Sequence, residues 1–317
     1  MAVQIAVIDD WQDVARGVVD WSVLDSLGEV TFVHEYPADN ATLAERLGRF
    51  EVICVMRERT RFDEDLLKRL PNLKLLVTGG MRNAALDMPA AARLGIKVCG
   101  TDSYKHAAPE LTWTLIMAAT RNLVNEANAL RAGQWQQGLG SDLHGKTLGI
   151  LGLGSIGQRV AQFGQVFGMR VIAWSENLTA ERAEQAGVTY VSKQQLFEQA
   201  DVLSVHLVLS DRSRGLVDAQ ALAWMKPTAL LVNTARGPIV DETALIKALQ
   251  KQRIGGAALD VFDQEPLPAL HPFRTLDNVL ATPHVGYVSR QNYELFFSQI
   301  IEDIQAWSTG EPVRLLN

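Results

Sequence analysis

The segment at 147–176 constrains the fold of this chain most, because its pattern fits one kind of supersecondary unit. It opens with a short apolar run at 147–151, which is typical of a buried parallel strand. Three glycines follow with G-x-G-x-x-G spacing: Gly152, Gly154 and Gly157. An amphipathic helical pattern comes next, and a second apolar run at 171–174 predicts another strand. Strand, glycine turn, helix and strand within about 30 residues are the context that a dinucleotide-binding turn requires.

Each glycine of this turn has a separate physical reason. The first allows a tight turn, the second lets the backbone approach a pyrophosphate, and the third lets helix and strand pack closely. The start of the helix then offers unpaired N–H groups to the phosphates. A glycine-rich turn without a ligand is the alternative, but the flanking strands and helix favour nucleotide binding.

The end of the second strand bears on the choice of cofactor. An acidic residue usually stands there and binds the adenosine ribose, whereas this chain has Ser175, with Glu176 one position later. No Arg or Lys occurs between 171 and 180 to hold a 2′-phosphate. We therefore predict NAD, with NADP left open.

Length and charge limit the classes of protein to which the chain can belong. Its 317 residues suffice for two domains, and a net charge of −6 with scattered basic residues gives no field for nucleic acid or an acidic membrane surface. Cys54 and Cys99 each lie in an apolar, strand-like run, which predicts buried thiols and no metal site.

Targeting signals are also not expected. Residues 2–8 run directly into Asp9 and Asp10 as a first strand, which is unlike a signal peptide. The most apolar helical stretch, 111–119, is too short to span a bilayer. We expect a cytoplasmic protein.

Strand and helix patterns alternate along most of the chain, which predicts α/β architecture with two doubly wound parallel sheets. Asp39 or Asn40 is the expected N-cap of a helix over 41–47, and 109–131 is the longest helical pattern, starting at Pro109 and ending near Gly133. The strands are expected at 3–8, 30–34, 52–56, 73–78, 96–99, 147–151, 170–174, 202–207, 229–233, 256–261 and 278–282. An amphipathic helix over 290–307 ends the chain.

Three polar residues stand just past late strands: Arg236, Glu265 and His284. Such strand ends are where open α/β sheets bind ligands. The interconversion of a 2-keto and a 2-hydroxy acid needs these residue types. An Arg holds the carboxylate bidentately, a His gives or takes a proton at the carbonyl oxygen, and a Glu orients the His and favours its protonated form.

Each of these residues also has a structural interpretation. Arg236 could form a surface ion pair, Glu265 could be a solvated turn residue, and a His after Pro is often structural. His34, His106, His144 and His271 lack the strand-end context and are expected to be structural, whereas His206 closes a strand near the predicted cofactor turn. The convergence of three strand ends on a nucleotide turn favours catalysis.

Four ordered segments resemble the D-isomer-specific 2-hydroxyacid dehydrogenase family. They are GLGSIG at 152–157, NTARGPIVDETAL at 233–245, ALDVFDQEPLP at 258–268 and TPHVGY at 282–287. The resemblance extends to PELTWTLIMAATRN at 109–122 and covers nearly the whole chain.

The resemblance implies a flavodoxin-like substrate domain over 1–104 and 289–317, with a Rossmann-like NAD-binding domain over 105–288 inserted into it. It implies hydride transfer between a nicotinamide cofactor and a small 2-keto or D-2-hydroxy acid, and a homodimer built on the 109–131 helix. The implied catalytic residues are Arg236 for the carboxylate, His284 as acid/base and Glu265 as its partner. The implied cofactor contacts are Gly152, Gly154, Ser155, Ile156, Gly157, Ser175, His206, Thr234 and Asp260, the last at the nicotinamide carboxamide.

The loop at 78–83 departs from the family pattern. Aligned on Asp87, it supplies Gly79 and Gly80 to the substrate, and Arg82 occupies a position usually held by glycine. We hypothesise that Arg82 adds a charge that selects a second anionic group or a particular keto acid. The alternative is an outward-pointing surface side chain. Two other functions stay open: an NAD(H)-sensing, corepressor-like interaction protein, and the same fold acting on phosphorylated or dicarboxylic acids.

Overall fold

A computed structural model describes residues 2–34 and 39–317, which form two compact units. Unit 1 comprises residues 1–104 and 288–317, and unit 2 comprises residues 105–287. The chain therefore leaves unit 1, builds unit 2 as one continuous stretch, and returns to unit 1 with its last helix.

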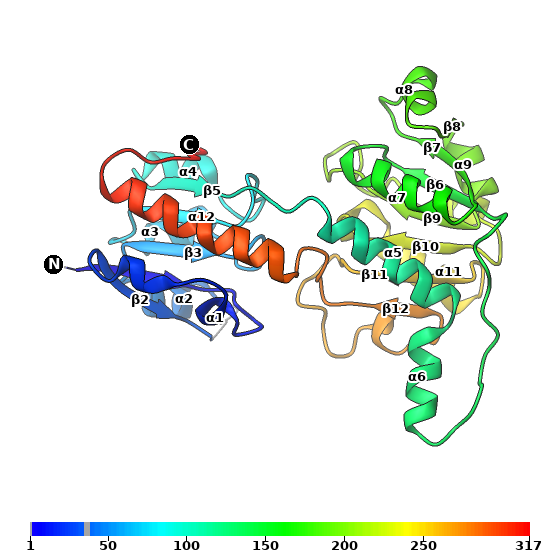
Figure 1. Ribbon diagram of the computed structural model, residues 1–317, viewed down its shortest axis with the longest axis horizontal. Coiled ribbons are helices and arrows are strands. Elements are labelled where there is room, and N and C mark those ends of the chain that lie inside the picture. The colour runs from blue at the N-terminus through cyan, green and yellow to red at the C-terminus, as the bar shows by residue number, and fades with distance from the viewer. Residues whose placement is uncertain (1, 35–38) are drawn as a thin grey trace. The chain divides into compact units, whose positions relative to one another are not determined.

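Unit 1, in which Figure 1 labels β2, β3 and β5, is built on a five-stranded sheet. Every pairing in this sheet is parallel, and the strand order is β2-β1-β3-β4-β5. Its strands are β1 (Val3–Val7), β2 (Gly28–Phe32), β3 (Val52–Val55), β4 (Leu75–Thr78) and β5 (Lys97–Gly100). This is the flavodoxin-like order, in which the strand sequence reverses between β1 and β3.

Helices cover both faces of this sheet. They are α1 (Ala15–Val18), α2 (Asn40–Leu47), α3 (Glu64–Lys68), α4 (Met88–Arg93) and α12 (Arg290–Ser308), with a 3₁₀ turn, η1 (Trp21–Leu24). α12 packs on β4, β5 and α1, while α2, α3 and α4 pack against one another in sequence. Phe296, Phe297 and Ile300 of α12 are almost fully buried, and each side chain contributes about 1.5–3 kcal/mol of hydrophobic stabilisation.

Unit 2 contains a seven-stranded parallel sheet in the order β12-β11-β10-β9-β6-β7-β8. Its strands are β6 (Thr147–Leu151), β7 (Arg170–Trp174), β8 (Thr189–Tyr190), β9 (Val202–Val205), β10 (Leu230–Asn233), β11 (Gly256–Leu259) and β12 (Val279–Ala281). The order reverses between β6 and β9, as in the dinucleotide-binding folds. The prediction of two doubly wound parallel sheets is confirmed.

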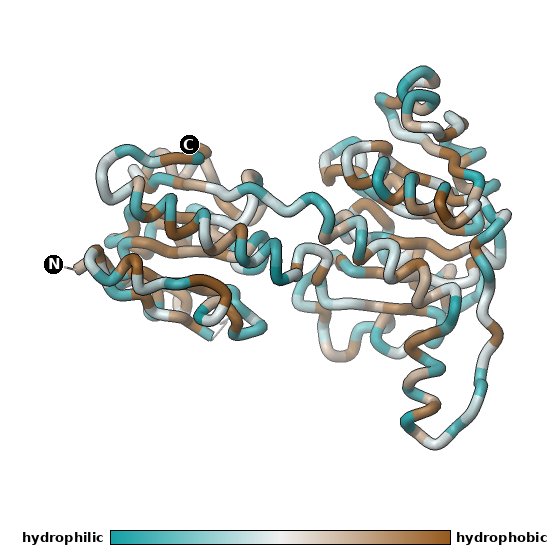
Figure 2. The backbone as a smooth tube through the Cα atoms, in the orientation of Figure 1, coloured by the Kyte–Doolittle hydropathy of each residue, from teal (hydrophilic) through white to brown (hydrophobic). Residues whose placement is uncertain are grey.

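Two apolar cores lie on the two faces of this sheet, and Figure 2 shows the apolar residues gathered on its strands. One core lies under α5 (Ala107–Thr120) and α7 (Ser155–Val166), and the other lies under α9 (Lys193–Gln199), α10 (Ala219–Trp224) and α11 (Glu242–Gln250). The remaining elements are α6 (Leu123–Arg131), α8 (Ala180–Gln185), η2 (Gly237–Ile239) and η3 (Pro272–Arg274).

The prediction of one helix over 109–131 is wrong. The segment forms α5 and α6, which are separated at Asn122, whose φ of 51° lies in the left-handed region and cannot continue an α-helix. α5 also begins at Ala107, two residues before Pro109. Gly133, with φ of 79°, follows the end of α6 as predicted.

Smaller predictions have mixed outcomes. Asp39 is the N-cap of α2, where its side chain accepts the N–H of Thr42, and both cysteines are buried free thiols. The expected strands at 202–207 and 256–261 end two residues early, at Val205 and Leu259. No helix in the described part of the chain is long and apolar enough to cross a membrane.

Candidate active site

The glycine turn joins β6 to α7 at the point where the strand order of unit 2 reverses. Gly152 has φ of 103°, which favours glycine, and its N–H donates to the carbonyl of Trp174 at 3.0 Å. A Cβ on Gly157 would lie 2.1 Å from the carbonyl oxygen of Gly152, so only glycine allows this approach of helix to strand. A Cβ on Gly154 would meet no atom within 4 Å.

This geometry fits a dinucleotide. Gly154 is exposed and leaves open space, and Ser155 and Ile156, both exposed, begin a helix of twelve residues. The first N–H groups of a helix have no partner within the helix, and its dipole favours anions there. The geometry suits a pyrophosphate, and the assignment of these residues to it stays a prediction.

Other predicted cofactor residues follow neighbouring strands. Ser175 follows β7 and is partly buried, whereas Glu176 is exposed. The ring of His206 lies after β9 with Nε2 2.8 Å from the Ser204 hydroxyl, and burial lowers its pKa to about 3, so it is neutral near pH 7. Thr234 follows β10 and its hydroxyl lies 2.7 Å from that of Thr112 on α5.

Arg236 stands in a turn that Asn233 fixes from the end of β10. The Asn233 side chain is almost fully buried, donates to the carbonyl of Arg236 at 3.0 Å and accepts the N–H of Ala235 at 3.0 Å. The guanidinium of Arg236 donates to the carbonyl of Ala235 at 2.7 Å. The turn thus presents a partly buried cation at the carboxyl end of the strand.

His284 and Glu265 form a close pair, as predicted. Nδ1 of His284 lies 2.5 Å from Oε2 of Glu265, and the other carboxylate oxygen accepts the N–H of Phe262 at 2.9 Å. Nδ1 therefore carries the proton toward Glu265, which leaves Nε2 for a reacting group. The His284 backbone has φ of 52°, an uncommon conformation for a non-glycine residue.

Asp260 holds the turn that carries His284. Its carboxylate is fully buried and accepts the Thr282 hydroxyl at 2.6 Å and the N–H groups of Val285 and Gly286 at 2.8 Å each. Burial raises the pKa of Asp260. Sequence reasoning assigned this residue to the nicotinamide alone and did not foresee these three bonds.

The predicted substrate loop of unit 1 follows β4. The N–H of Gly79 donates to the carbonyl of Val55 at 3.1 Å, and that of Gly80 donates to the Thr101 hydroxyl at 2.8 Å, so neither is available to a carboxylate in this conformation. Among the described residues, the backbone N–H groups of Met81 and Arg82 have no such partner. The Arg82 residue is exposed, as the surface alternative expected.

Unit 1 also contains a charged cluster that sequence reasoning missed. Asp9 follows β1, is fully buried with φ of 66°, and accepts the Thr60 hydroxyl at 2.6 Å. Arg59 donates to the Asp9 carbonyl. Burial raises the pKa of Asp9 to about 6. The sequence contains a signal for this cluster, because a charged segment follows directly after each of β1 and β3, the two strands between which the strand order reverses.

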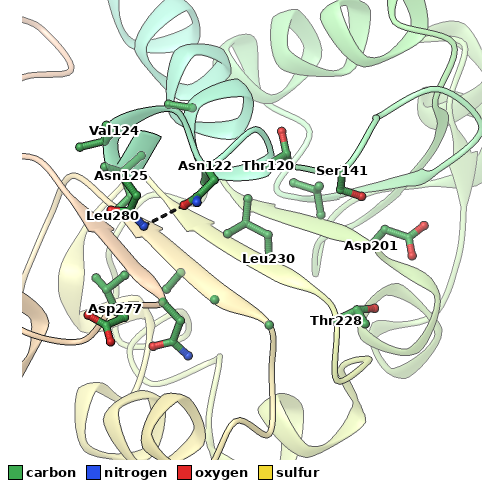
Figure 3. Close-up of a pocket in the computed structure, with 18 of the residues that line it drawn as sticks. Thr120, Asn122, Val124, Asn125, Ser141, Asp201, Thr228, Leu230, Asp277 and Leu280 are labelled. Atoms are coloured by element: carbon green, nitrogen blue, oxygen red, sulfur yellow. Dashed lines mark hydrogen bonds between the residues drawn. The ribbon is translucent and has the colours of Figure 1, made fainter. Parts of the chain in front are cut away.

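A cavity of about 360 Å³ lies at the amino-terminal ends of the strands of the unit 2 sheet, opposite the ends that carry the candidate active site (Figure 3). Lys146, Asp201, Thr228 and Asn278 line it, and each of them precedes a strand. The predicted cofactor and catalytic residues follow strands, so this cavity is separate from the candidate active site.

A histidine paired with a carboxylate can move a proton, and a dinucleotide turn at the same sheet edge positions a hydride carrier. Unit 2 therefore has the parts of a nicotinamide-dependent oxidoreductase.

Comparison with known proteins narrows this class. Residues 113–286 match the family model described as "D-isomer specific 2-hydroxyacid dehydrogenase, NAD binding domain". A glyoxylate reductase of Aeropyrum pernix is 40% identical over 81% of this chain and 80% of its own length. A D-3-phosphoglycerate dehydrogenase of Methanocaldococcus jannaschii is 34% identical over 91% of this chain, which spans only 55% of that protein. The crystal structure of a phosphoglycerate oxidoreductase from Vibrio cholerae is 41% identical, with a TM-score of 0.93 over 97% of this chain and 99% of that one.

The chain belongs to the D-isomer-specific 2-hydroxyacid dehydrogenase family. It is an NAD-dependent oxidoreductase that acts on the CH–OH group of 2-hydroxy acids. The alternative of a corepressor-like interaction protein receives no support from these relatives, which carry the names of enzymes.

Proposed function

We propose that the protein reduces a small 2-keto acid, with His284 as acid/base, Glu265 as its partner and Arg236 as the carboxylate ligand. The observation that carries this proposal is the 2.5 Å pair between His284 Nδ1 and Glu265 Oε2, which leaves Nε2 as the proton donor. The bound cofactor would supply the hydride.

The roles of the chain's own residues follow from their chemistry. A protonated His284 gives its Nε2 proton to the carbonyl oxygen as that oxygen gains negative charge. The Glu265 carboxylate stabilises the imidazolium and holds the ring plane. Arg236 binds the carboxylate in a bidentate way that fixes the keto carbon. The backbone N–H groups of Met81 and Arg82 are the proposed donors from the loop after β4, in place of those of Gly79 and Gly80.

The first test is His284→Ala, with keto acid reduction and NADH binding measured separately. Loss of the proton donor should lower kcat by about 10²–10⁴-fold while NADH affinity stays near wild type. Retained turnover would contradict the assignment of the acid/base, and lost NADH binding would contradict its separation from the cofactor site.

A panel of 2-keto acids should identify the substrate. Glyoxylate, hydroxypyruvate, pyruvate, phenylpyruvate and oxaloacetate should each be tested with NADH and with NADPH, and the cofactor ratio reports what Ser175 and Glu176 do. The likeness to the phosphoglycerate oxidoreductase of Vibrio cholerae favours a phosphorylated 2-keto acid as the second candidate, so phosphohydroxypyruvate completes the panel.

We also propose a homodimer through the α5–α6 region. α6 contains no buried residue, and it projects from unit 2 together with the segment that follows it (Figure 1). Large apolar side chains are exposed there: Leu123 (59%), Leu130 (60%), Trp135 (75%) and Leu139 (99%). Apolar patches of this kind mark protein interfaces.

Light scattering of the paired change Leu123→Glu and Leu130→Glu tests the dimer. The variant should be monomeric, whereas Leu270→Glu, which replaces an even more exposed leucine outside this region, should stay dimeric. An unchanged mass for the paired variant would refute the interface. The cytoplasmic location remains a prediction that cell fractionation can test.

A further inference from the structure

A second histidine–glutamate pair joins the loop that carries Glu265 to α11. Nε2 of His271 is 3.1 Å from Oε1 of Glu242, and the two side chains are only 13% and 22% exposed. Sequence reasoning took His271 to be structural and gave Glu242 no role. Neither residue belongs to the proposed acid/base couple.

Glu242 bridges the two ends of this loop. It is the first residue of α11, which follows the Arg236 turn, and its second oxygen accepts the N–H of Asp263 at 3.3 Å. The preceding N–H, that of Phe262, donates to Glu265 at 2.9 Å. The Glu242 carboxylate therefore holds the Asp263 N–H, which is next to the Phe262 N–H that orients Glu265. The same carboxylate also holds His271, eight residues after Asp263.

The hydrogen bonds of His271 indicate its tautomer. Its Nδ1 accepts the N–H of Phe273 at 3.3 Å, so Nδ1 carries no proton and Nε2 is the nitrogen that donates to Glu242. The His271 ring packs on Phe273 with centroids 4.9 Å apart, and Phe273 in turn contacts Phe262 at 6.2 Å. The pair is thus continuous with the residue that orients Glu265.

Packing ties the same loop to the Arg236 turn. A Cβ on Gly237 would lie 2.1 Å from the carbonyl carbon of Phe262, so the two backbones are in direct contact. Charged groups lie near Asp263, which this pair holds: Glu242 and Asp241 carry the same charge, and Arg214 carries the opposite charge. Burial, followed by the Glu242 charge, raises the pKa of Asp263.

We propose that Glu242 and His271 are a positioning pair for the reaction: they hold the loop so that the Glu265 carboxylate meets Nδ1 of His284. The inference rests on the proposed function, in which Glu265 and His284 are the acid/base couple. If the pair is broken, the loop relaxes and the carboxylate stabilises the imidazolium of His284 less well.

The test is the pH profile of keto acid reduction by His271→Leu and His271→Gln. A Leu cannot donate to Glu242, so the Glu265 carboxylate should stabilise the imidazolium of His284 less well. The alkaline limb of the kcat profile should then move down by about half a pH unit or more, and kcat at pH values above the limb should fall about threefold or more. A Gln offers an N–H near the position of Nε2, and it should restore kcat to within about twofold of wild type.

NADH affinity should not change in either variant, and Lys226→Met is the matched control. Lys226 forms a 2.7 Å ion pair with Asp201 at the opposite edge of the same sheet, so its loss should leave the pH profile unaltered. A wild-type alkaline limb in His271→Leu, or a Gln variant no better than Leu, would overturn the proposal and leave the pair a purely structural one.

Glu242→Gln carries the test if His271→Leu does not fold. The two donors bind different oxygens of Glu242, and in Gln one of these oxygens becomes an NH2 group that cannot accept, so the bond from Asp263 or the bond from His271 is lost. The limb should therefore move in the same direction. An unmoved limb would overturn the proposal. His284→Ala distinguishes failure of the proposed function from failure of the positioning role. Wild-type turnover in His284→Ala would refute the acid/base couple itself. An inactive His284→Ala together with a wild-type pH profile in His271→Leu would refute only the role of the positioning pair.

Discussion

Gly157 offers a test in which one methyl group should disturb both folding and cofactor binding. In Gly157→Ala the new Cβ would lie 2.1 Å from the Gly152 carbonyl oxygen and 3.1 Å from Cγ2 of Ile150. Ordinary contacts of this kind are about 3.3–3.6 Å, so α7 must move by about 1 Å from β6. Overpacking of this size lowers the free energy of unfolding by about 1–3 kcal/mol. A displacement of about 1 Å in an element that positions a ligand lowers the reaction rate by up to about 100-fold.

Gly154→Ala is the matched partner of this variant. Its Cβ would meet nothing within 4 Å and its φ of −82° suits alanine, so the free energy of unfolding should change by less than about 1 kcal/mol. The methyl group would nevertheless occupy the open space proposed for the pyrophosphate. We expect weaker NADH binding, by about tenfold or more, with normal stability.

Urea unfolding and NADH fluorescence titration on the same preparations measure the two effects. Gly157→Ala should lose about 2–3 kcal/mol of unfolding free energy and bind NADH at least about tenfold more weakly, a difference of about 1.4 kcal/mol. Gly17→Ala, another position with nothing within 4 Å, should do neither. Wild-type NADH affinity in Gly154→Ala would refute the assignment of this turn to the pyrophosphate.

Three further predictions concern single side chains. Arg236→Lys should raise KM for the keto acid about tenfold or more, because a point charge cannot replace the guanidinium fork; an unchanged KM in steady-state assays would count against carboxylate binding there. Burial raises the pKa of Asp303 to about 7 from 3.8, so between about pH 4 and pH 7 the folded state keeps a proton that the unfolded state has lost, and stability falls as pH rises through that window. Asp303→Asn should remove this slope. In urea unfolding, the free energy of unfolding should fall more from pH 5 to pH 8 in wild type than in the variant, by on the order of 1 kcal/mol, and equal decreases would contradict this prediction. Asp260→Asn leaves one oxygen for the N–H groups of Val285 and Gly286, so it should cost about 1–3 kcal/mol in urea unfolding, and an unaltered midpoint would show that these bonds contribute little.

The architecture, and the grouping of the candidate site residues, could be predicted from the sequence. Apolar runs and helical periods are local properties of the chain, and the glycine turn contains within six residues the conformational freedom that its geometry requires. Parallel strands bring their carboxyl ends to one sheet edge, so Arg236, Glu265 and His284 could be grouped from their positions after strands alone. The close pairing of Glu265 with His284 followed from that grouping and from the chemistry of the two side chains.

The hydrogen bonds between distant segments, in contrast, depend on the tertiary structure. The break at Asn122 depends on one backbone angle that the amphipathic pattern does not encode. The N–H groups of Gly79 and Gly80 are satisfied by β3 and by Thr101, so the loop can offer different donors from those its glycines indicated. Asp260 and Glu242 each bind atoms more than 20 residues away. The packing of the elements and the orientation of the side chains determine such partners. The local sequence pattern determines neither the packing nor the orientation.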